Sequence, residues 1–465
     1  MEAAGKSLEG DSVLRRKAYE KLINWKTTYQ GSCAMLIEGV RRVGKTTLVT
    51  EFAEREYENY LLIDFSVAPV EVRDLFEQYR HDVDLFLRLL TTYYGVKLEP
   101  RESLIIFDEV QRLPIAREFI KHLVADGRFD YIETGSLISI KRNVEGILIP
   151  SEERSMELAP LDFEEFCWAM GEEQLAELIR ESFESLAPLP DALHRKAERL
   201  FREYMLIGGM PQAVEKYRST GDFGATDDTK RQILKLYQED IEKFTNGERG
   251  KVQAIFQGIP GQLSKHEKRF VFSSVDESYR YRDLEAPFTW LSEAKLVNLC
   301  RNAADPSVGL AASLEDNALK CYFCDTGLLV AHTFADRSET PHEVYRSILF
   351  DKLEINEGMY TENVVAQQLH ANGRKLFFYS RNDNNEARNT MEIDFLIVRE
   401  YENAGLKARV SPVEVKSTKR YQAASLAKFK SKFNKRVGTQ YILHPKPIQN
   451  EGERIRLPLY MAHCL

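Results

Sequence analysis

Residues 34–53, AMLIEGVRRVGKTTLVTEFA, leave few folds open to this chain. Gly39, four further residues and then Gly-Lys-Thr at 44–46 fit the pattern G-x-x-x-x-G-K-[ST], whose curled backbone surrounds phosphate groups. The apolar run at 35–37 predicts a buried strand, and apolar residues recur at helical spacing over 48–53. A glycine-rich loop between a strand and a helix is the setting of a phosphate-binding loop. The stretch therefore predicts an α/β fold that binds a nucleoside triphosphate.

The loop also assigns roles to individual side chains. We expect Lys45 to reach the β- and γ-phosphates and the Thr46 hydroxyl to ligate Mg²⁺. ATP and Mg²⁺ are thus the expected cofactors. The nucleotide-binding positions predicted within the loop are Gly39, Arg42, Val43, Gly44, Lys45, Thr46 and Thr47.

Composition excludes several other classes of protein. The 465 residues carry a formal net charge of −8, so whole-molecule attraction to nucleic acid or acidic lipid is not implied. Six unevenly spaced cysteines do not suggest a disulfide framework. The first ten residues lack the apolar core of a signal peptide, and no apolar run is long enough for a membrane span. We expect a cytoplasmic protein with no membrane partner.

Strands and helices alternate after the loop. Apolar strands are predicted at 60–65, 103–107 and 130–134, with helices at 83–94 and 116–125 between them. Such alternation predicts a parallel sheet with helices on both faces, whose ligands bind at the carboxyl ends of the strands. The polar strand ends should therefore meet in one crevice.

Two of these strand ends carry the expected hydrolytic chemistry. Asp108 ends an apolar strand, where a nucleotidase holds its Mg²⁺ through water, and Glu109 is placed to orient or deprotonate the attacking water. Thr134 or Ser136, at the end of the next strand, would be the polar sensor of the γ-phosphate.

The predicted secondary structure changes twice along the rest of the chain. It is helical from about 165 to 245, has short helical pieces to about 305, and mixes strands with helices beyond 310. We predict four segments: a P-loop ATPase core at 12–165, a helical lid at 166–245, a winged-helix-like segment at 246–310 and a nuclease-like α+β domain at 311–465.

Several motifs together resemble prokaryotic ATPases of the AAA superfamily, in the branch of archaeal ATPases near the signal-transducing NTPases. The resemblance covers about residues 13–443 and rests on 39–46, FDEVQRLP at 107–114 and TGS at 134–136. Further landmarks are APLDFEEF at 159–166, GGMP at 208–211 and YFCDTGL at 322–328.

The resemblance implies roles that spacing alone does not. Arg154 would act as a finger on a neighbouring nucleotide, although the family's Gly-Arg pair is Glu153-Arg154 here, and Arg142 is the competing candidate. Gly209 and Pro211 match the Gly-x-Pro motif that couples nucleotide state to lid position.

The segment around Trp290 resembles the winged helix that follows the lid in this family, where such folds bind DNA or serve as packing modules. A modest basic cluster at Lys265, His266, Lys268 and Arg269 is more simply explained as a solvated face.

The last segment contains a second set of chemically interesting residues. Glu362 lies on a predicted helix, Asp394 on the strand EIDFLIV, and Glu414 and Lys416 share one face of the strand PVEVK. If the two strands pair, Asp394 and Glu414 can converge on one divalent cation while Lys416 stabilises the attacking water or the scissile phosphate. This order resembles restriction-endonuclease-like nucleases. A structural ion pair across a sheet is the plain alternative.

The following helix would present a basic face suited to a phosphate backbone, made of Lys428, Lys430, Lys432, Lys435 and Arg436. Cys321 and Cys324 have zinc-ligand spacing but no second pair nearby, so we assign them to packing.

Two functional interpretations remain open. In the first, an ATPase carries a C-terminal domain that binds or cleaves nucleic acid, with Glu362, Asp394, Glu414 and Lys416 catalysing a Mg²⁺-dependent cleavage. In the second, the chain is a nucleotide-controlled signalling or partner-binding switch with an inactive nuclease-like domain. A protein partner and a homo-oligomer are compatible with both.

Overall fold

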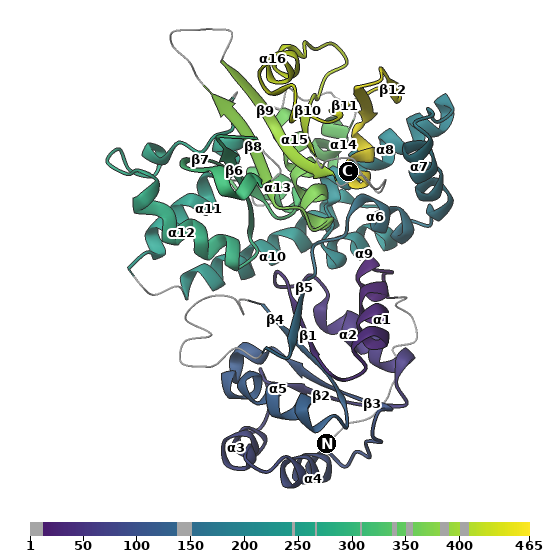
Figure 1. The fold of residues 1–465 in the computed structure, drawn as a ribbon, viewed down its shortest axis with the longest axis vertical. Coiled ribbons are helices and arrows are strands. Elements are labelled where there is room, and N and C mark those ends of the chain that lie inside the picture. Colours follow the sequence, from purple (N-terminus) through teal and green to yellow (C-terminus); the bar gives the residue numbers. More distant parts are fainter. Residues whose placement is uncertain are drawn as a thin grey trace. The chain divides into compact units, whose positions relative to one another are not determined.

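The computed structural model describes residues 13–136, 151–243, 247–265, 267–306, 309–336, 342–349, 357–381, 390–399 and 409–465. The chain folds into two compact units (Figure 1). The N-terminal unit comprises Met1–Ala159 and Glu293–Lys295, and the C-terminal unit comprises Pro160–Ser292 and Leu296–Leu465. None of the helices within the described ranges has the length and apolar character needed to cross a membrane.

The N-terminal unit is built on a five-stranded sheet of order β2-β3-β4-β1-β5, in which every pairing is parallel. Its strands are β1 (Ala34–Glu38), β2 (Asn59–Asp64), β3 (Ser103–Asp108), β4 (Asp130–Gly135) and β5 (Glu153–Glu157). The predicted α/β fold with a parallel sheet is confirmed.

Helices follow these strands as the alternating pattern predicts. They are α1 (Lys17–Tyr29), α2 (Lys45–Glu56), α3 (Val70–Tyr79), α4 (Val83–Tyr94), the 3₁₀ turn η1 (Val110–Arg112) and α5 (Pro114–Asp126). Every residue of β3 is buried, which explains its continuous apolar run, because a central parallel strand is covered on both faces. Phe76 packs edge-on against Phe65, Phe86 and Phe107, so the helices are held on the sheet by a dense aromatic core.

The C-terminal unit begins with a series of helices. They are α6 (Phe163–Ala169), α7 (Glu173–Ser185), α8 (Asp191–Ile207), α9 (Pro211–Thr220), α10 (Phe223–Glu242), α11 (Arg249–Leu263) and α12 (Tyr281–Glu293). The helical stretch predicted from about 165 to 245 corresponds to α6 through α10. Later helices are α13 (Thr326–Thr333), α14 (His342–Leu349), α15 (Glu357–Ala371) and α16 (Ala424–Phe433), with the 3₁₀ segment η6 (Leu459–Cys464) at the end.

An eight-stranded mixed sheet of order β12-β13-β11-β10-β9-β8-β6-β7 organises the rest of this unit (Figure 1). Its strands are β6 (Val297–Ala303), β7 (Leu314–Phe323), β8 (Leu376–Arg381), β9 (Met391–Arg399), β10 (Arg409–Val415), β11 (Gln440–His444), β12 (Gln449–Asn450) and β13 (Arg454–Pro458). The α15-β8-β9-β10-α16-β11 succession places strands where the sequence predicts them.

The segment predicted to be winged-helix-like contains α11, α12 and β6. Strand β6 pairs with β7 in antiparallel fashion and with β8 in parallel fashion. Part of residues 246–310 is thus a component of the sheet that continues into 311–465.

Candidate functional site

Backbone conformation at two glycines shapes the loop between β1 and α2. Gly44 has φ +94°, a left-handed conformation that side chains other than glycine rarely adopt, and it caps the start of α2. A Cβ atom at Gly39 would lie 2.5 Å from the carbonyl oxygen of Leu158. Both glycines are therefore required by the path of the chain, and the N–H groups at the start of α2 face the loop.

Lys45 is buried at the first position of α2. Its ammonium donates to the carbonyl oxygens of Gly39, at 2.9 Å, and Val40, at 3.2 Å. Burial lowers the pKa of Lys45 to about 8, against the opposite effect of Glu109 and Asp108. The ammonium thus lies against the loop that the sequence predicts to surround the phosphates.

Three oxygen-bearing side chains from different elements meet beside this lysine. The Thr46 hydroxyl of α2 lies 2.9 and 3.1 Å from the two carboxylate oxygens of Asp108 at the end of β3. The Thr134 hydroxyl of β4 donates to the same carboxylate. A hydroxyl and a carboxylate in contact are hard oxygen ligands of the kind that Mg²⁺ takes, so Thr46 and Asp108 fit the predicted ion.

Glu109 follows Asp108 in a left-handed conformation, with φ +55°. Its carboxylate accepts a hydrogen bond of 2.6 Å from the Gln111 side-chain amide, which fixes its direction. The sequence-based analysis assigned no role to Gln111, although it lies in the same FDEVQRLP motif. Glu109 and Gln111 are two residues apart in a tight turn, and a contact of this kind produces no periodic pattern in the sequence.

Arg16 is a further residue without a sequence-based assignment. Its buried guanidinium donates to the carbonyl oxygens of Val43, at 3.1 Å, and Ala159, at 2.6 Å. It therefore ties the phosphate-binding loop to the chain segment that leaves the N-terminal unit. An arginine directly before a helix carries no pattern that would reveal this.

The remaining predicted positions of the N-terminal unit are placed as follows. Arg42 and Thr47 are exposed, Val43 is buried, and Ser136 is buried directly after β4. Thr134, rather than Ser136, is the hydroxyl that contacts Asp108. The nucleotide contacts of all four positions stay predictions.

Arg154 is exposed on the edge strand β5, with its guanidinium carbon 5.6 Å from the Tyr29 ring centroid. It pairs with Met35 near the start of β1, whereas the phosphate-binding loop follows the end of that strand at Glu38. Arg154 thus lies near the amino end of β1, whereas Lys45 follows the carboxyl end of that strand. The competing Arg142 lies outside the described residues.

In the C-terminal unit, the strands that carry Asp394 and Glu414 pair as the sequence analysis required. Strand β9 is antiparallel to β10, with Phe395 opposite Val413, which places Asp394 opposite Glu414. Asp394 accepts a hydrogen bond of 2.9 Å from the Val415 backbone, and Lys416 forms an ion pair of 3.1 Å with Glu414.

A lysine that the sequence analysis did not single out lies at the centre of this cluster. The fully buried Lys320 of β7 lies 3.0 Å from Glu362, 2.9 Å from Glu392 and 3.6 Å from Asp394. Lys268 forms a second ion pair with Glu362, at 2.9 Å, and the Tyr322 hydroxyl donates to the same carboxylate.

The positive and negative groups of the cluster favour each other's charged forms. Burial acts to raise the pKa of Glu362, but the ammonium groups of Lys320 and Lys268 lower it to about 2. Burial likewise acts to lower the pKa of Lys320, and the three surrounding carboxylates outweigh it and raise that pKa. Both groups are therefore charged across the physiological range.

The divalent cation predicted for Asp394 and Glu414 stays a prediction. The Lys320 ammonium forms ion pairs with Glu362 and Asp394, so it supplies a positive charge between these two carboxylates. In the part of the chain that the structure describes, no three histidine, cysteine, aspartate or glutamate side chains are arranged to hold a metal ion.

The predicted basic face of α16 is largely engaged within its own unit. Lys428 donates to the Thr390 carbonyl and Lys432 to the Tyr379 hydroxyl, each at 3.0 Å. Further contacts join Arg436 to Asp305 and Lys430 to Glu453.

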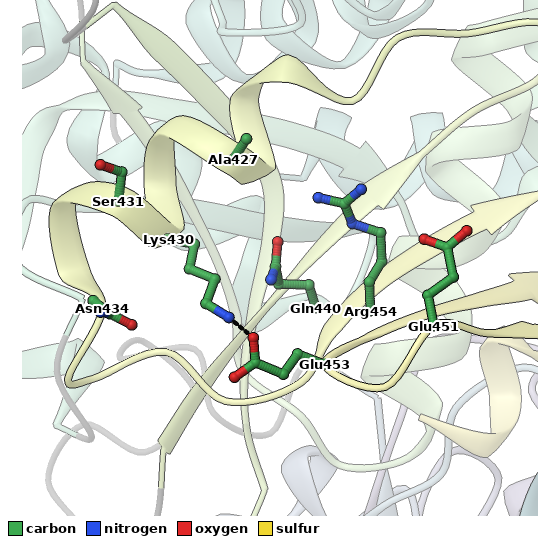
Figure 2. A pocket seen from close by; sticks show the side chains of 8 residues that line it. All are labelled: Ala427, Lys430, Ser431, Asn434, Gln440, Glu451, Glu453 and Arg454. Carbon is green, nitrogen blue, oxygen red and sulfur yellow. Dashed lines mark ion pairs between the residues drawn. The ribbon is translucent and has the colours of Figure 1, made fainter.

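Figure 2 shows the Lys430–Glu453 pair at the wall of a cleft of about 490 Å³. The cleft lining also carries Arg454 and Glu451, so positive and negative side chains alternate around it. The structure thus reveals mixed charge where the sequence predicted a continuous basic surface.

Two smaller predictions can be compared with the structure directly. Cys321 and Cys324 are both buried, in agreement with a packing role. In the predicted basic cluster, Lys268 contacts Glu362, Arg269 contacts Glu267, and His266 lies outside the described residues.

Comparison with known proteins bears on three stretches of the chain. Residues 32–167 match the family model of an AAA domain. Residues 198–339 and 357–460 match two domains of unknown function, DUF8612 and DUF4143. None of the curated proteins matches this chain.

Solved structures give only distant likenesses. A Walker-type ATPase of Pyrococcus abyssi is 15% identical, with a TM-score of 0.38, and the match covers 69% of this chain and 96% of that chain. A signal transduction ATPase with a tetratricopeptide repeat sensor from Pyrococcus horikoshii is 14% identical, with a TM-score of 0.27, covering 77% of this chain and 48% of that one. Drosophila ORC bound to AT-rich DNA and Cdc6 is 12% identical, with a TM-score of 0.24, covering 69% and 92%. These scores are too low to support an argument.

The AAA match spans the strands and loops that bring Lys45, Thr46 and Asp108 together. Over residues 32–167 this chain is therefore similar to an AAA domain.

Proposed function

We propose that the N-terminal unit binds and hydrolyses ATP with Mg²⁺. The observation that carries this proposal is the convergence of Lys45, Thr46 and Asp108 at the carboxyl ends of β1 and β3. A phosphate-binding lysine and a hydroxyl at the start of a helix rarely meet a strand-end carboxylate for structural reasons alone.

Each side chain has a definable part in the reaction. Lys45 binds the β- and γ-phosphates, and Thr46 and Asp108 would hold Mg²⁺, which supplies positive charge beside the phosphate oxygens. Thr134 holds the Asp108 carboxylate from the other side. Glu109, directed by Gln111, orients the attacking water and accepts its proton.

Two variants separate binding from hydrolysis. We expect Lys45→Ala to abolish ATP binding, and Glu109→Gln to retain binding while hydrolysis falls by about 10²–10⁴-fold. Glu58→Gln is the matched control, because Glu58 is an exposed carboxylate of the same unit outside the site. Hydrolysis at the wild-type rate in Lys45→Ala would remove the proposal.

Arg154 leads to a specific proposal about assembly. From its place beside Met35 it is about 10 Å of strand away from its own loop, at about 3.3 Å per residue. We therefore propose that it serves the nucleotide of a second copy of the chain. A mixture of Arg154→Ala and Lys45→Ala chains should hydrolyse ATP faster than either alone, and an Arg154→Ala chain with wild-type turnover would exclude the role.

A second function, the nucleotide-controlled switch, is favoured by how closely the lid is joined to the rest of the C-terminal unit. Asp325, just before α13, accepts hydrogen bonds from the backbone of Gly209, at 2.5 Å, and Leu328, at 2.9 Å. A Cβ atom at Gly208 would lie 2.1 Å from an Asp325 carboxylate oxygen. The GGMP and CDTG motifs thus interlock.

Helix α15 adds a second set of connections from its polar side. Gln368 accepts a hydrogen bond of 2.8 Å from the Phe163 backbone in α6 and donates one of 2.8 Å to the Tyr204 hydroxyl in α8. Gln367 donates to Tyr204 as well, at 2.9 Å. The lid helices are therefore bonded to the helix that carries Glu362.

These contacts mean that a displacement of the lid would carry the strands of the C-terminal sheet with it. In a switch, a partner that binds the C-terminal sheet would respond to the nucleotide state.

One experiment distinguishes the switch from the nuclease. Purified wild-type and Asp394→Ala chains are incubated with DNA and with RNA in Mg²⁺ or Mn²⁺. The switch predicts no cleavage by either chain, whereas cleavage by the wild type that is lost in Asp394→Ala would establish the nuclease instead.

A further inference from the structure

We propose that the Lys320 ammonium is a built-in cation of the C-terminal acidic cluster: it takes the place of a divalent metal ion, and removing it converts the cluster into a divalent-cation site. Asp394, which the sequence predicts as a metal ligand, lies 3.6 Å from this buried ammonium. The inference is independent of ATP hydrolysis in the N-terminal unit.

The ammonium has the surroundings of a bound ion. Its nitrogen lies close to oxygens of three carboxylates, at 2.9 Å from Glu392, 3.0 Å from Glu362 and 3.6 Å from Asp394. The carboxylates come from α15 and β9, so the charge joins a helix to the sheet. Lys320 is only 1% exposed, which leaves water little access to these contacts.

The carboxylates are also held in place by other groups. The Asp394 carboxylate accepts from the Val415 backbone at 2.9 Å, and Glu362 is bound by Lys268 at 2.9 Å and by the Tyr322 hydroxyl. A divalent ion would need oxygen ligands at about 2.0–2.6 Å, and several of them. The carboxylate oxygens are held around one position, and the Lys320 ammonium occupies that position.

Electrostatic repulsion explains why the Lys320 ammonium and a divalent ion would not occupy the cluster together. With Lys320 present, placing a divalent ion beside a buried ammonium would bring like charges into contact in a site with little solvent screening. With Lys320 shortened to alanine, the three carboxylates would share a cavity in which Lys268 still pairs with Glu362. A metal ion of suitable size would then relieve their repulsion.

The test measures Mn²⁺ binding by the loss of the free-ion electron paramagnetic resonance signal. All chains are full length, contain no nucleotide and carry Asp108→Asn, which removes the metal ligand of the N-terminal site. We expect the parent with Lys320 to show no C-terminal Mn²⁺ site. Lys320→Ala should bind Mn²⁺ at least about tenfold more tightly, and Mn²⁺ should raise its Tm but not that of the parent.

Two matched variants make the result specific. Lys320→Arg keeps the positive charge and should bind no Mn²⁺, while Asp394→Asn added to Lys320→Ala should abolish the new site. Mn²⁺ binding by the parent that disappears with Asp394→Asn would overturn the proposal. So would a Lys320→Ala chain that binds Mn²⁺ no better than the parent, or one that stays unfolded in Mn²⁺, because the ion must replace the missing charge.

Discussion

Lys45 shows how one buried residue links binding to pH. Its pKa of about 8 results mainly from burial, and ATP phosphates would raise it, because they favour the protonated ammonium. The nucleotide-free chain must therefore take up a proton on binding ATP once the pH exceeds about 8. We predict that ATP affinity is constant below about pH 7 and falls by up to about tenfold per pH unit above pH 8.

Calorimetric titration between pH 6.5 and 9.5 measures this dependence. Lys45→Arg is the control, because its guanidinium does not titrate in this range and its weaker binding should not vary with pH. Wild-type affinity that stays constant to pH 9.5 would show that Lys45 is already protonated there or makes no phosphate contact.

The buried Glu133 leads to a prediction about the stability of the N-terminal unit. It lies on β4, fully buried, and burial together with the charge of Glu153 raises its pKa well above the usual range. Unfolding frees this carboxyl to ionise at its ordinary pKa near 4.5, so the N-terminal unit loses stability as the pH rises above that value. Glu133→Gln removes the loss, and we predict that its Tm at pH 7 rises by about 2–4 °C.

The neighbouring Glu153 provides a control of opposite sign. Arg117 holds it with two hydrogen bonds, at 2.9 and 3.1 Å, so Glu153→Gln breaks a buried ion pair and should lower the Tm. Thermal unfolding of both variants from pH 5 to 8 separates the two effects. If Glu133→Gln lowers the Tm at every pH, the Glu133 carboxyl stabilises the fold and the prediction fails.

At the scale of elements, the N-terminal unit was the more predictable from sequence. Its strands are buried on both faces, so β1 and β3 appear as apolar runs that end in polar residues. Parallel strands bring those ends to one edge, which is why the proximity of Asp108 to Thr46 followed from order along the chain alone.

The C-terminal elements were predictable in place but less so in their contacts. Lys320 lies in the strand sequence ALKCYF, where a lysine looks like a solvent-facing residue, and only the packing of α15 over the sheet shows that it is buried. The basic side chains of α16 were expected to face solvent, yet Lys430 pairs with Glu453, which lies in the turn before β13. Partners distant in sequence leave no local pattern.

Close approach of elements leads to a prediction about α13. A Cβ atom at Gly327 would lie 2.1 Å from the Ile207 carbonyl oxygen at the end of α8, and backbone atoms cannot move aside easily. We predict that Gly327→Ala destabilises the C-terminal unit by about 3 kcal/mol. The control is Gly258→Ala in α11, where a Cβ atom meets nothing within 4 Å, and which should stabilise the unit by about 0.5–1 kcal/mol. Denaturant unfolding measures both, and equal stabilities would contradict the prediction.

At the scale of the whole molecule, the division into two units determines which helices and strands unfold together. The predicted boundaries between lid, winged-helix-like segment and last domain all fall inside the C-terminal unit. Its lid helices are joined to α13 and α15 by buried hydrogen bonds from Asp325, Gln367 and Gln368. Buried contacts of this density favour one cooperative unfolding unit over separate ones.

Hydrogen exchange can test that cooperativity with the variant that strains the α8–α13 contact. We predict that Gly327→Ala accelerates exchange of the slowest amides in α8 and in β9 by the same factor, about 100-fold for a loss near 3 kcal/mol, because both exchange through opening of one unit. The amides of β1 and β3, in the N-terminal unit, should keep their wild-type rates. Acceleration confined to the lid helices would mean that the lid opens alone, and a lid that opens alone could not transmit nucleotide state to the C-terminal sheet.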